Sequence, residues 1–201
     1  MAKTTRTLVT VAVIAAAFFG GARSSAAAEG DTRTVVLHVD DHAHLAPSEL
    51  ATAEAETTRI YAAAGVRATW ENGTVDPHAR LDDVTHLVVV ICGAAGSEQK
   101  TAAEGVDPTV VGQAARGTGR AYIYYSRVAF AAHQHARDVG TVLGMAIAHE
   151  VGHLLLPINS HSFVGIMRAD LELTSMLPKE FTLRQSATIR ASLSGDARTA
   201  R

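Results

Sequence analysis

Residues 145–156 read Met-Ala-Ile-Ala-His-Glu-Val-Gly-His-Leu-Leu-Leu and contain the pattern His-Glu-x-x-His. On an α helix, residues four apart lie about one turn apart on the same face, so His149 and His153 would present their imidazole rings side by side. Apolar residues recur around the pattern at helical spacing, and no proline occurs between Asp138 and Leu156. This predicts one unbroken helix that carries three ionisable side chains into the core.

These side chains have the residue types and the spacing of a catalytic zinc site. The two imidazoles can bind one Zn²⁺, and Glu150 can reach a water molecule on the metal. Zinc lowers the pKa of that water and the carboxylate accepts its proton, which is the chemistry of a metal hydrolase. The alternative is a buried helix whose two histidines are satisfied by unrelated partners. Because three buried polar groups would then each need a separate partner, we predict a shared metal site.

A third zinc ligand is expected from the segment that follows the helix. Pro157 cannot continue the helix, and Asn159 tolerates the left-handed conformation that a sharp reversal needs. The chain can therefore bring His161 back to the metal. The alternative third ligands are carboxylates further along the chain, Asp170, Glu172 and Glu180.

The run H-E-V-G-H-L-L-L-P-I-N-S-H-S, followed by G-I-M at residues 165–167, resembles the metzincin clan of zinc peptidases. The pattern of the clan is H-E-x-x-H-x-x-G-x-x-H followed by a Met-turn. Here the glycine position falls on Leu156, the third histidine position falls on Asn159, and His161 comes two residues later. The chain therefore resembles a variant of the clan with a longer turn.

The resemblance implies that His149, His153 and His161 hold one Zn²⁺. It also implies that Glu150 is the general base and that Met167 lies under the site in a Met-turn. Without such a turn, Met167 would be an ordinary core methionine. The implied activity is hydrolysis of a peptide or protein substrate by an endopeptidase. The rival from another class is a secreted zinc-binding module without catalysis, but zinc binding alone does not require the Glu150 carboxylate.

The remaining pattern predicts an α+β fold of zincin or metzincin type. We expect a mixed, twisted sheet packed on the active-site helix, with a small irregular C-terminal part. Strands are predicted at residues 34–39, 66–70, 85–91 and 120–126, and further helices at residues 47–64 and 182–193. Residues 93–119 have little apolar periodicity and are expected to form a long loop.

The resemblance also makes the strand at residues 120–126 the edge strand beside the cleft, where an extended substrate can add by main-chain hydrogen bonds. Tyr122, Tyr124 and Tyr125 either line that cleft or pack within the sheet. His133 and His135 are expected to face solvent before the active helix. The pair His42 and His44 is expected in a solvated turn, with metal binding as the alternative.

The first 28 residues resemble a secretory signal. Lys3 and Arg6 precede an apolar run at residues 8–19, and three alanines at residues 26–28 supply a cleavage site. We therefore predict a secreted or periplasmic protein in which residues 29–201 form a single metallopeptidase-like domain without stable membrane association. The alternative is an uncleaved N-terminal anchor.

The charge and the cysteine content limit the classes of protein to which the chain can belong. Without the three basic residues of the signal, 15 of the 18 basic residues remain against 20 acidic ones, and no basic patch indicates a nucleic-acid partner. Cys92 is the only cysteine, so the chain has no internal disulfide. It follows an apolar run and is expected to pack as a small hydrophobic residue.

Overall fold

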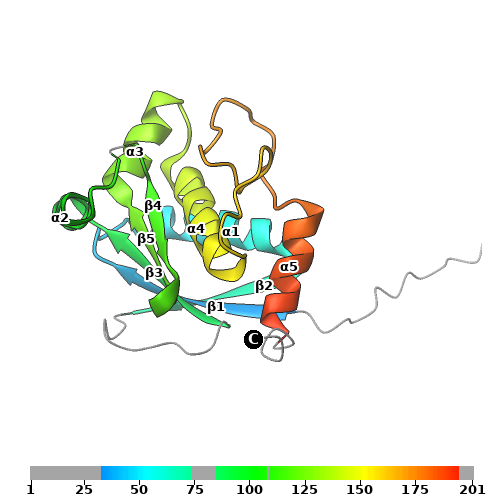
Figure 1. Ribbon diagram of the computed structural model, residues 1–201. Helices are drawn as coiled ribbons and strands as arrows, with labels where there is room; N and C mark the ends of the chain where they lie inside the picture. Colours follow the sequence, from blue (N-terminus) through cyan, green and yellow to red (C-terminus); the bar gives the residue numbers. More distant parts are fainter. Residues whose placement is uncertain (1–32, 74–84, 108, 195–201) are drawn as a thin grey trace, which may run out of the picture. The chain divides into compact units, whose positions relative to one another are not determined.

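The computed structural model describes residues 33–73, 85–107 and 109–194, which form an α+β fold around a five-stranded mixed sheet (Figure 1). The strand order is β2-β1-β3-β5-β4. The first four strands in this order are parallel, and β4 pairs antiparallel with β5 at one edge. The strands are β1 (Arg33–Asp41), β2 (Val66–Asn72), β3 (His86–Cys92), β4 (Gly112–Ala115) and β5 (Arg120–Tyr124). The expected signal segment lies outside the described residues.

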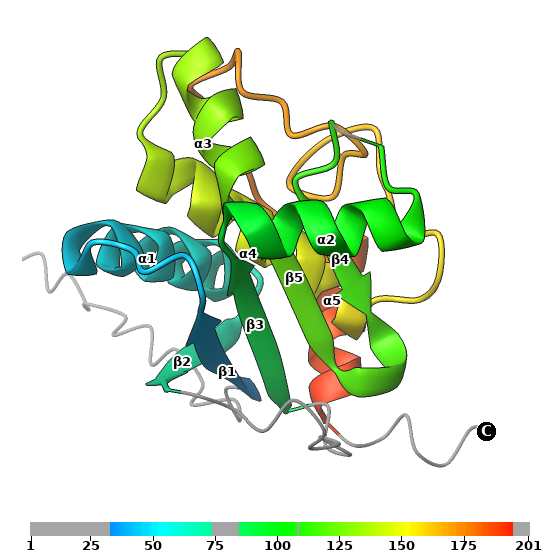
Figure 2. The same cartoon turned by 90° about the vertical axis from the view of Figure 1, so that its left-hand side faces the viewer.

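The helices pack on this sheet from both sides. Two of them, α1 and α4, lie together on one face, and α5 packs against α4 and β1 (Figure 1). Figure 2 shows α2 on the opposite side of the sheet from α4, near the ends of β3 and β5. The helices are α1 (Pro47–Ala63), α2 (Ala94–Glu104), α3 (Tyr125–Gln134), α4 (Val139–Leu155) and α5 (Leu183–Leu193), with a 3₁₀ turn η1 (Arg116–Thr118). No helix in these described ranges is long and apolar enough to cross a membrane.

The central helix α4 is the unbroken helix that the sequence predicts. It begins after Asp138, whose side chain accepts a hydrogen bond from the Thr141 backbone N–H at 2.7 Å, and it ends before Pro157. Its residues are buried almost throughout, because the sheet, α1 and α5 enclose it. Glycine permits the close contact with α1: a Cβ at Gly144 would lie 2.6 Å from the Ala53 carbonyl oxygen.

Two buried side chains of α1 fix the rotation of α4. The Thr57 hydroxyl donates to the Gly144 carbonyl at 2.9 Å, and the Tyr61 hydroxyl donates to the Ala148 carbonyl at 3.2 Å. Both hydroxyls are fully buried, so losing either partner would leave a polar group unsatisfied in the core. With this face of α4 held against α1, the side chains at positions 149, 150 and 153 lie along the cleft described below.

The prediction of a long loop at residues 93–119 is wrong, because this segment contains α2, β4 and η1. The inward positions of α2 are polar: Ser97 and Thr101 are buried and donate to the carbonyls of Gly93 and Ser97, each at 2.8 Å. Strand β4 adds no apolar signal either, since it reads Gly-Gln-Ala-Ala and is held by main-chain pairing with β5. Both elements therefore lack the apolar periodicity on which the prediction depended.

The prediction that residues 120–126 form the edge strand beside the cleft is also wrong. Strand β5 lies between β3 and β4, and it ends at Tyr124 because Tyr125 begins α3. Tyr124 is fully buried and its hydroxyl donates to the Gln113 side chain at 2.9 Å. Tyr122 lies under the Lys100 ammonium, whose nitrogen is 4.0 Å from the ring centroid. The three tyrosines thus pack within the fold, and β4 takes the edge position.

Several smaller predictions are confirmed. Cys92 is buried, and burial raises the pKa of its thiol, as expected for a packing residue. His133 and His135 are exposed at the end of α3. His42 and His44 are also exposed in the turn after β1, and His42 Nε2 lies 3.1 Å from an Asp40 carboxylate oxygen.

Candidate metal centre

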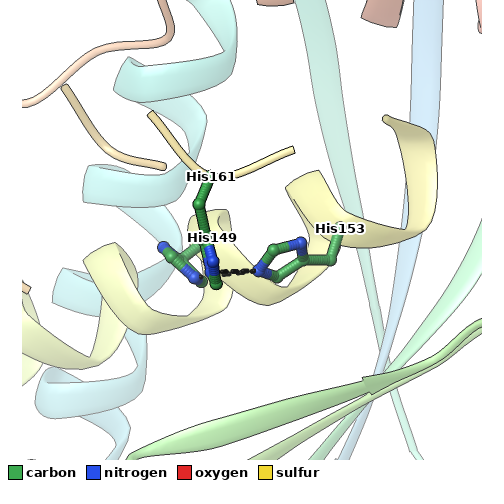
Figure 3. Close-up of side chains that lie close together, drawn as sticks. All are labelled: His149, His153 and His161. Carbon is green, nitrogen blue, oxygen red and sulfur yellow. Dashed lines mark hydrogen bonds between the residues drawn. The ribbon is translucent and has the colours of Figure 1, made fainter. Parts of the chain in front are cut away.

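Three histidines converge beside α4. His149 and His153 project from the helix, and His161 reaches them from the loop that follows it (Figure 3). The Nε2 atom of His153 lies 3.0 Å from Nε2 of His149 and 3.0 Å from Nε2 of His161. One nitrogen from each ring lies within 4.8 Å of the other two. The structure therefore brings together all three predicted ligands.

The other ring nitrogens of the two helical histidines are held by neighbouring groups. His149 Nδ1 lies 2.8 Å from the Ile166 carbonyl oxygen, and His153 Nδ1 lies 3.0 Å from the Ser160 hydroxyl. Because a carbonyl oxygen only accepts, His149 must carry its proton on Nδ1, which leaves the Nε2 lone pair free. Both partners orient their histidine for metal binding, and the carbonyl also fixes the tautomer of His149.

The protonation of these rings also suits a metal. Burial, more than any other cause, lowers the pKa of His149 and lowers the pKa of His153 to about 3. The neighbouring charges of His149, His161 and Arg116 lower the pKa of His153 further. The rings of His149 and His153 are therefore neutral at physiological pH, which is the form that binds a metal. Three imidazoles with converging Nε2 atoms fit the donor set of a catalytic zinc ion.

The loop that carries His161 reverses as the sequence predicts. Asn159 adopts a left-handed conformation with φ 61°, just after Pro157 ends the helix. The Arg116 guanidinium donates to the Pro157 carbonyl at 2.9 Å. From the other side, the Gln185 side-chain amide donates to the Ser160 carbonyl at 3.0 Å. The position of His161 thus depends on contacts from both η1 and α5.

Residues 162–167 form a tight turn under α4. The Ser162 N–H donates to the Met167 carbonyl at 2.8 Å, and Gly165 has φ 79°. Met167 is fully buried, and a Cβ at Gly152 would lie 2.6 Å from its sulfur. Met167 therefore packs on the helical turn that carries His153, while the Ile166 carbonyl of the same loop turn orients His149.

Glu150 lies between α4 and β4 and lines the cleft beside His149 and His153. Burial raises the pKa of its carboxyl group to about 8, and no hydrogen bond to the carboxyl group is found among the described residues. A dication bound by the histidines would favour the charged form and lower this pKa again. A buried carboxylate without a fixed partner can accept a proton from a reacting group in the cleft.

Each of the three alternative carboxylate ligands pairs with a basic side chain, and Asp170 also lines the cleft. Asp170 accepts two hydrogen bonds from Arg168, at 3.1 and 3.0 Å. Glu172 accepts a hydrogen bond from Lys179, and this contact is the largest cause that lowers its pKa to about 2. Glu180 lies 3.8 Å from Arg59. Within the described residues, the only group of three or more potential metal-binding side chains is the histidine cluster.

The cluster opens into a cleft with a volume of about 590 Å³. One wall is formed by residues 109–114 and therefore includes the edge strand β4. The segment after α4 also lines the cleft. Its lining residues include Ile158 and Asn159, which precede His161, and Leu171 and Leu173, which follow it. Neither Tyr122, Tyr124 nor Tyr125 lines this cleft.

Sequence reasoning missed the residues that support the histidines from outside the motif. Ser160, the Ile166 carbonyl and Arg116 reach the site through contacts between segments. Nothing in their local pattern marks them, because a serine, a main-chain carbonyl and a surface arginine are common everywhere. The one available signal is proximity in sequence, since Ser160 directly precedes His161.

Comparison with known proteins identifies a solved structure of similar fold. No known protein family and no curated protein matches this sequence. A solved structure does match: the zinc-dependent peptidase from Methanocorpusculum labreanum (strain Z), with a TM-score of 0.50 and 12% sequence identity. The match covers 76% of this chain and 99% of that protein. At this identity the likeness shows a shared fold, and the described chain is thus an α+β protein of peptidase-like fold with three histidines that could form a metal site.

Proposed function

We propose that this protein is a secreted zinc-dependent peptidase. The observation that carries the proposal is the convergence of three histidine Nε2 atoms beside the buried Glu150 carboxyl group, in a cleft open to a substrate. The fold shared with a zinc-dependent peptidase supports it. In this proposal His149, His153 and His161 hold one Zn²⁺, and Glu150 is the general base.

Zinc held by the histidines supplies a Lewis acid that polarises the peptide carbonyl and lowers the pKa of water. Glu150 accepts a proton from the water molecule that attacks the carbonyl carbon, and the C–N bond breaks in the following step. The same carboxyl group then gives the proton to the leaving amine nitrogen, so Glu150 returns to its ionised form. The products are a new carboxylate and a new amine.

The cleft geometry supports a peptide or protein substrate. Residues 109–114 border the cleft, and β4 is an edge strand of the sheet, so an extended peptide can pair with β4 on the side away from β5. This gives β4 the role that the sequence suggested for residues 120–126. Because the cleft lies on the surface and its lining mixes polar and apolar side chains, we propose cleavage within a chain, as in an endopeptidase.

We also propose that the protein is related to the metzincin clan of zinc peptidases, as a variant with a longer turn before the third histidine. Its support is the reversal at Asn159 and the tight turn at residues 162–167, with Met167 packed under α4. Export through cleavage after residue 28 is part of the proposal and rests on the sequence of the first 28 residues. The substrates would then be peptides or proteins outside the cytoplasm.

The experiment that tests the function is cleavage of an unbiased peptide library by the zinc-loaded mature protein. We expect cleavage that a chelator abolishes and that Glu150→Gln reduces by roughly 10²-fold or more. Glu150→Gln should retain zinc and fold, since the amide preserves the size of the side chain. Glu98→Gln, an exposed position on α2, is the matched control and should leave activity unchanged.

Two results would redirect the proposal. Cleavage that survives both the chelator and Glu150→Gln would come from another site or from a contaminant. Zinc binding without any cleavage across a broad library would instead favour a secreted zinc-binding module without catalysis.

A further inference from the structure

Gly112, the first residue of β4, lies directly against the side chain of Glu150. A Cβ at Gly112 would lie 2.7 Å from Glu150 Cγ, 3.0 Å from Glu150 Oε1 and 2.9 Å from the Tyr122 carbonyl oxygen. Carbon atoms do not approach other heavy atoms to 2.7 Å without a shift of one of them. Both groups have an atom less than 3.0 Å from this Cβ, and the Glu150 side chain is the more movable of the two because the Tyr122 carbonyl belongs to the main chain of the paired strand β5.

The backbone conformation at this position does not itself require glycine. Gly112 is not among the residues with positive φ, in contrast to Gly165 at φ 79°. Any L-residue could adopt the extended conformation of β4 here. The need for glycine therefore comes from the space that the Glu150 side chain and the Tyr122 carbonyl occupy.

Packing is what defines the position of the Glu150 side chain. No hydrogen bond to its carboxyl group is found among the described residues, while its Cγ and Oε1 lie against the Gly112 main chain. The carboxyl group must lie within hydrogen-bond reach of the water that it deprotonates, and a misplacement of about 1 Å can cost roughly 10²-fold in rate.

We propose that Gly112 is a positioning residue for Glu150: the missing side chain creates the slot in which the carboxyl group is held between β4 and α4. This inference rests on the proposed peptidase function. In this proposal Gly112 acts through Glu150, and its own main chain also lines the cleft. A methyl group at position 112 should displace the carboxyl group and leave the zinc ligands in place.

The first test is the activity of Gly112→Ala. We expect kcat to fall roughly 10-fold or more, with KM and bound zinc within about 2-fold of the wild-type values. The control is Gly117→Ala in η1, where no heavy atom lies within 4 Å of the added Cβ and φ is not positive. This variant should keep wild-type kcat.

The second test detects the contact between position 112 and the Glu150 side chain without an activity assay. Gly112→Ala should lower the melting temperature of the zinc-free protein by roughly 3–10 °C through overpacking. In a Glu150→Ala background the crowding side chain is gone and only the Tyr122 carbonyl stays close, so the drop should be clearly smaller. A structural role that acts through the Tyr122 carbonyl would give the same drop in both backgrounds.

The outcomes separate this inference from the function on which it rests. Loss of kcat with retained zinc, together with the coupled melting temperatures, supports the positioning role. An active wild type with an equally active Gly112→Ala variant, or equal melting-temperature drops in both backgrounds, overturns the positioning role alone. A zinc-loaded wild type that cleaves nothing overturns the proposed function, and the positioning role falls with it.

Discussion

The two sides of the cleft are built in different ways. On one side, the sheet and α4 form a continuous core in which nearly every α4 residue is buried. On the other side, residues 157–182 contain no helix or strand and are held by hydrogen bonds and by four side chains that reach the core, Ile166, Met167, Leu173 and Phe181. Two of the proposed ligands come from the first region, and the third comes from the second.

The difference shows in what fixes each ligand. His149 and His153 take their relative position from helical geometry, and the surrounding core distributes the cost of any single change over many neighbours. His161 depends on the left-handed Asn159, on the hydrogen bond from Arg116 and on the turn that contains Gly165. We therefore expect single changes in the loop to affect zinc affinity more than comparable changes at the ends of α4.

The largest expected effect comes from removing a ligand from either region. His153→Ala and His161→Ala should each abolish stoichiometric zinc binding, because two imidazoles remain where a catalytic zinc ion takes three protein ligands. The comparison variants replace the alternative ligands, Asp170→Ala, Glu172→Ala and Glu180→Ala, and should keep about one zinc per chain. Metal analysis of the purified proteins measures this directly. Loss of zinc in one carboxylate variant, with zinc retained in His161→Ala, would transfer the third ligand to that carboxylate.

An intermediate effect is expected from Gly165→Ala in the loop. The residue has φ 79°, and a Cβ there would lie 2.3 Å from the Glu180 carbonyl oxygen, so alanine cannot occupy this turn without a backbone shift. Because the neighbouring Ile166 carbonyl orients His149, the shift should weaken zinc binding by roughly 10- to 100-fold, the range for loss of an outer partner. Zinc titration with a competing chelator measures the change.

The matched control for that variant is Gly96→Ala in α2, where nothing lies within 4 Å of the added Cβ. It should leave zinc affinity unchanged and, as a glycine-to-alanine change within a helix, should not destabilise the fold. Equal zinc affinities for the two variants would show that the loop turn does not hold the site.

The smallest effect is expected from Asp138→Ala at the beginning of α4. It removes the side chain that caps the Thr141 N–H and should cost about 1 kcal/mol of unfolding free energy. Zinc affinity should stay at the wild-type value, since the cap lies at the opposite end of the helix from His149 and His153. Denaturant unfolding and zinc titration of the same samples check both parts. A large loss of zinc affinity here would contradict the proposed difference between the two regions.

Much of the sheet and two flanking helices could be predicted because their signals are local. Residues 34–39 are mostly apolar, a pattern typical of a strand. Helix α5 begins after its cap Thr182, as predicted, and Thr182 forms a capping box with Gln185. The prediction fails for α2 and β4, whose inward positions are small or polar. It also assigns the sheet edge to the wrong strand, because strand order depends on pairing between distant segments, and β4 is too short and too weakly apolar to be recognised.

The sequence by itself determined the pair His149 and His153, the adjacent Glu150, the end of α4 before Pro157 and the reversal at Asn159. These follow from helical periodicity and from the backbone preferences of single residues, which act within a few positions along the chain. Only the tertiary structure decided that His161 reaches the pair, that Ile166 and Ser160 orient the rings, and that Gly112 leaves space for Glu150. Those arrangements depend on contacts between segments up to about 40 residues apart, such as Arg116 with Pro157, and such contacts form only when the whole core packs.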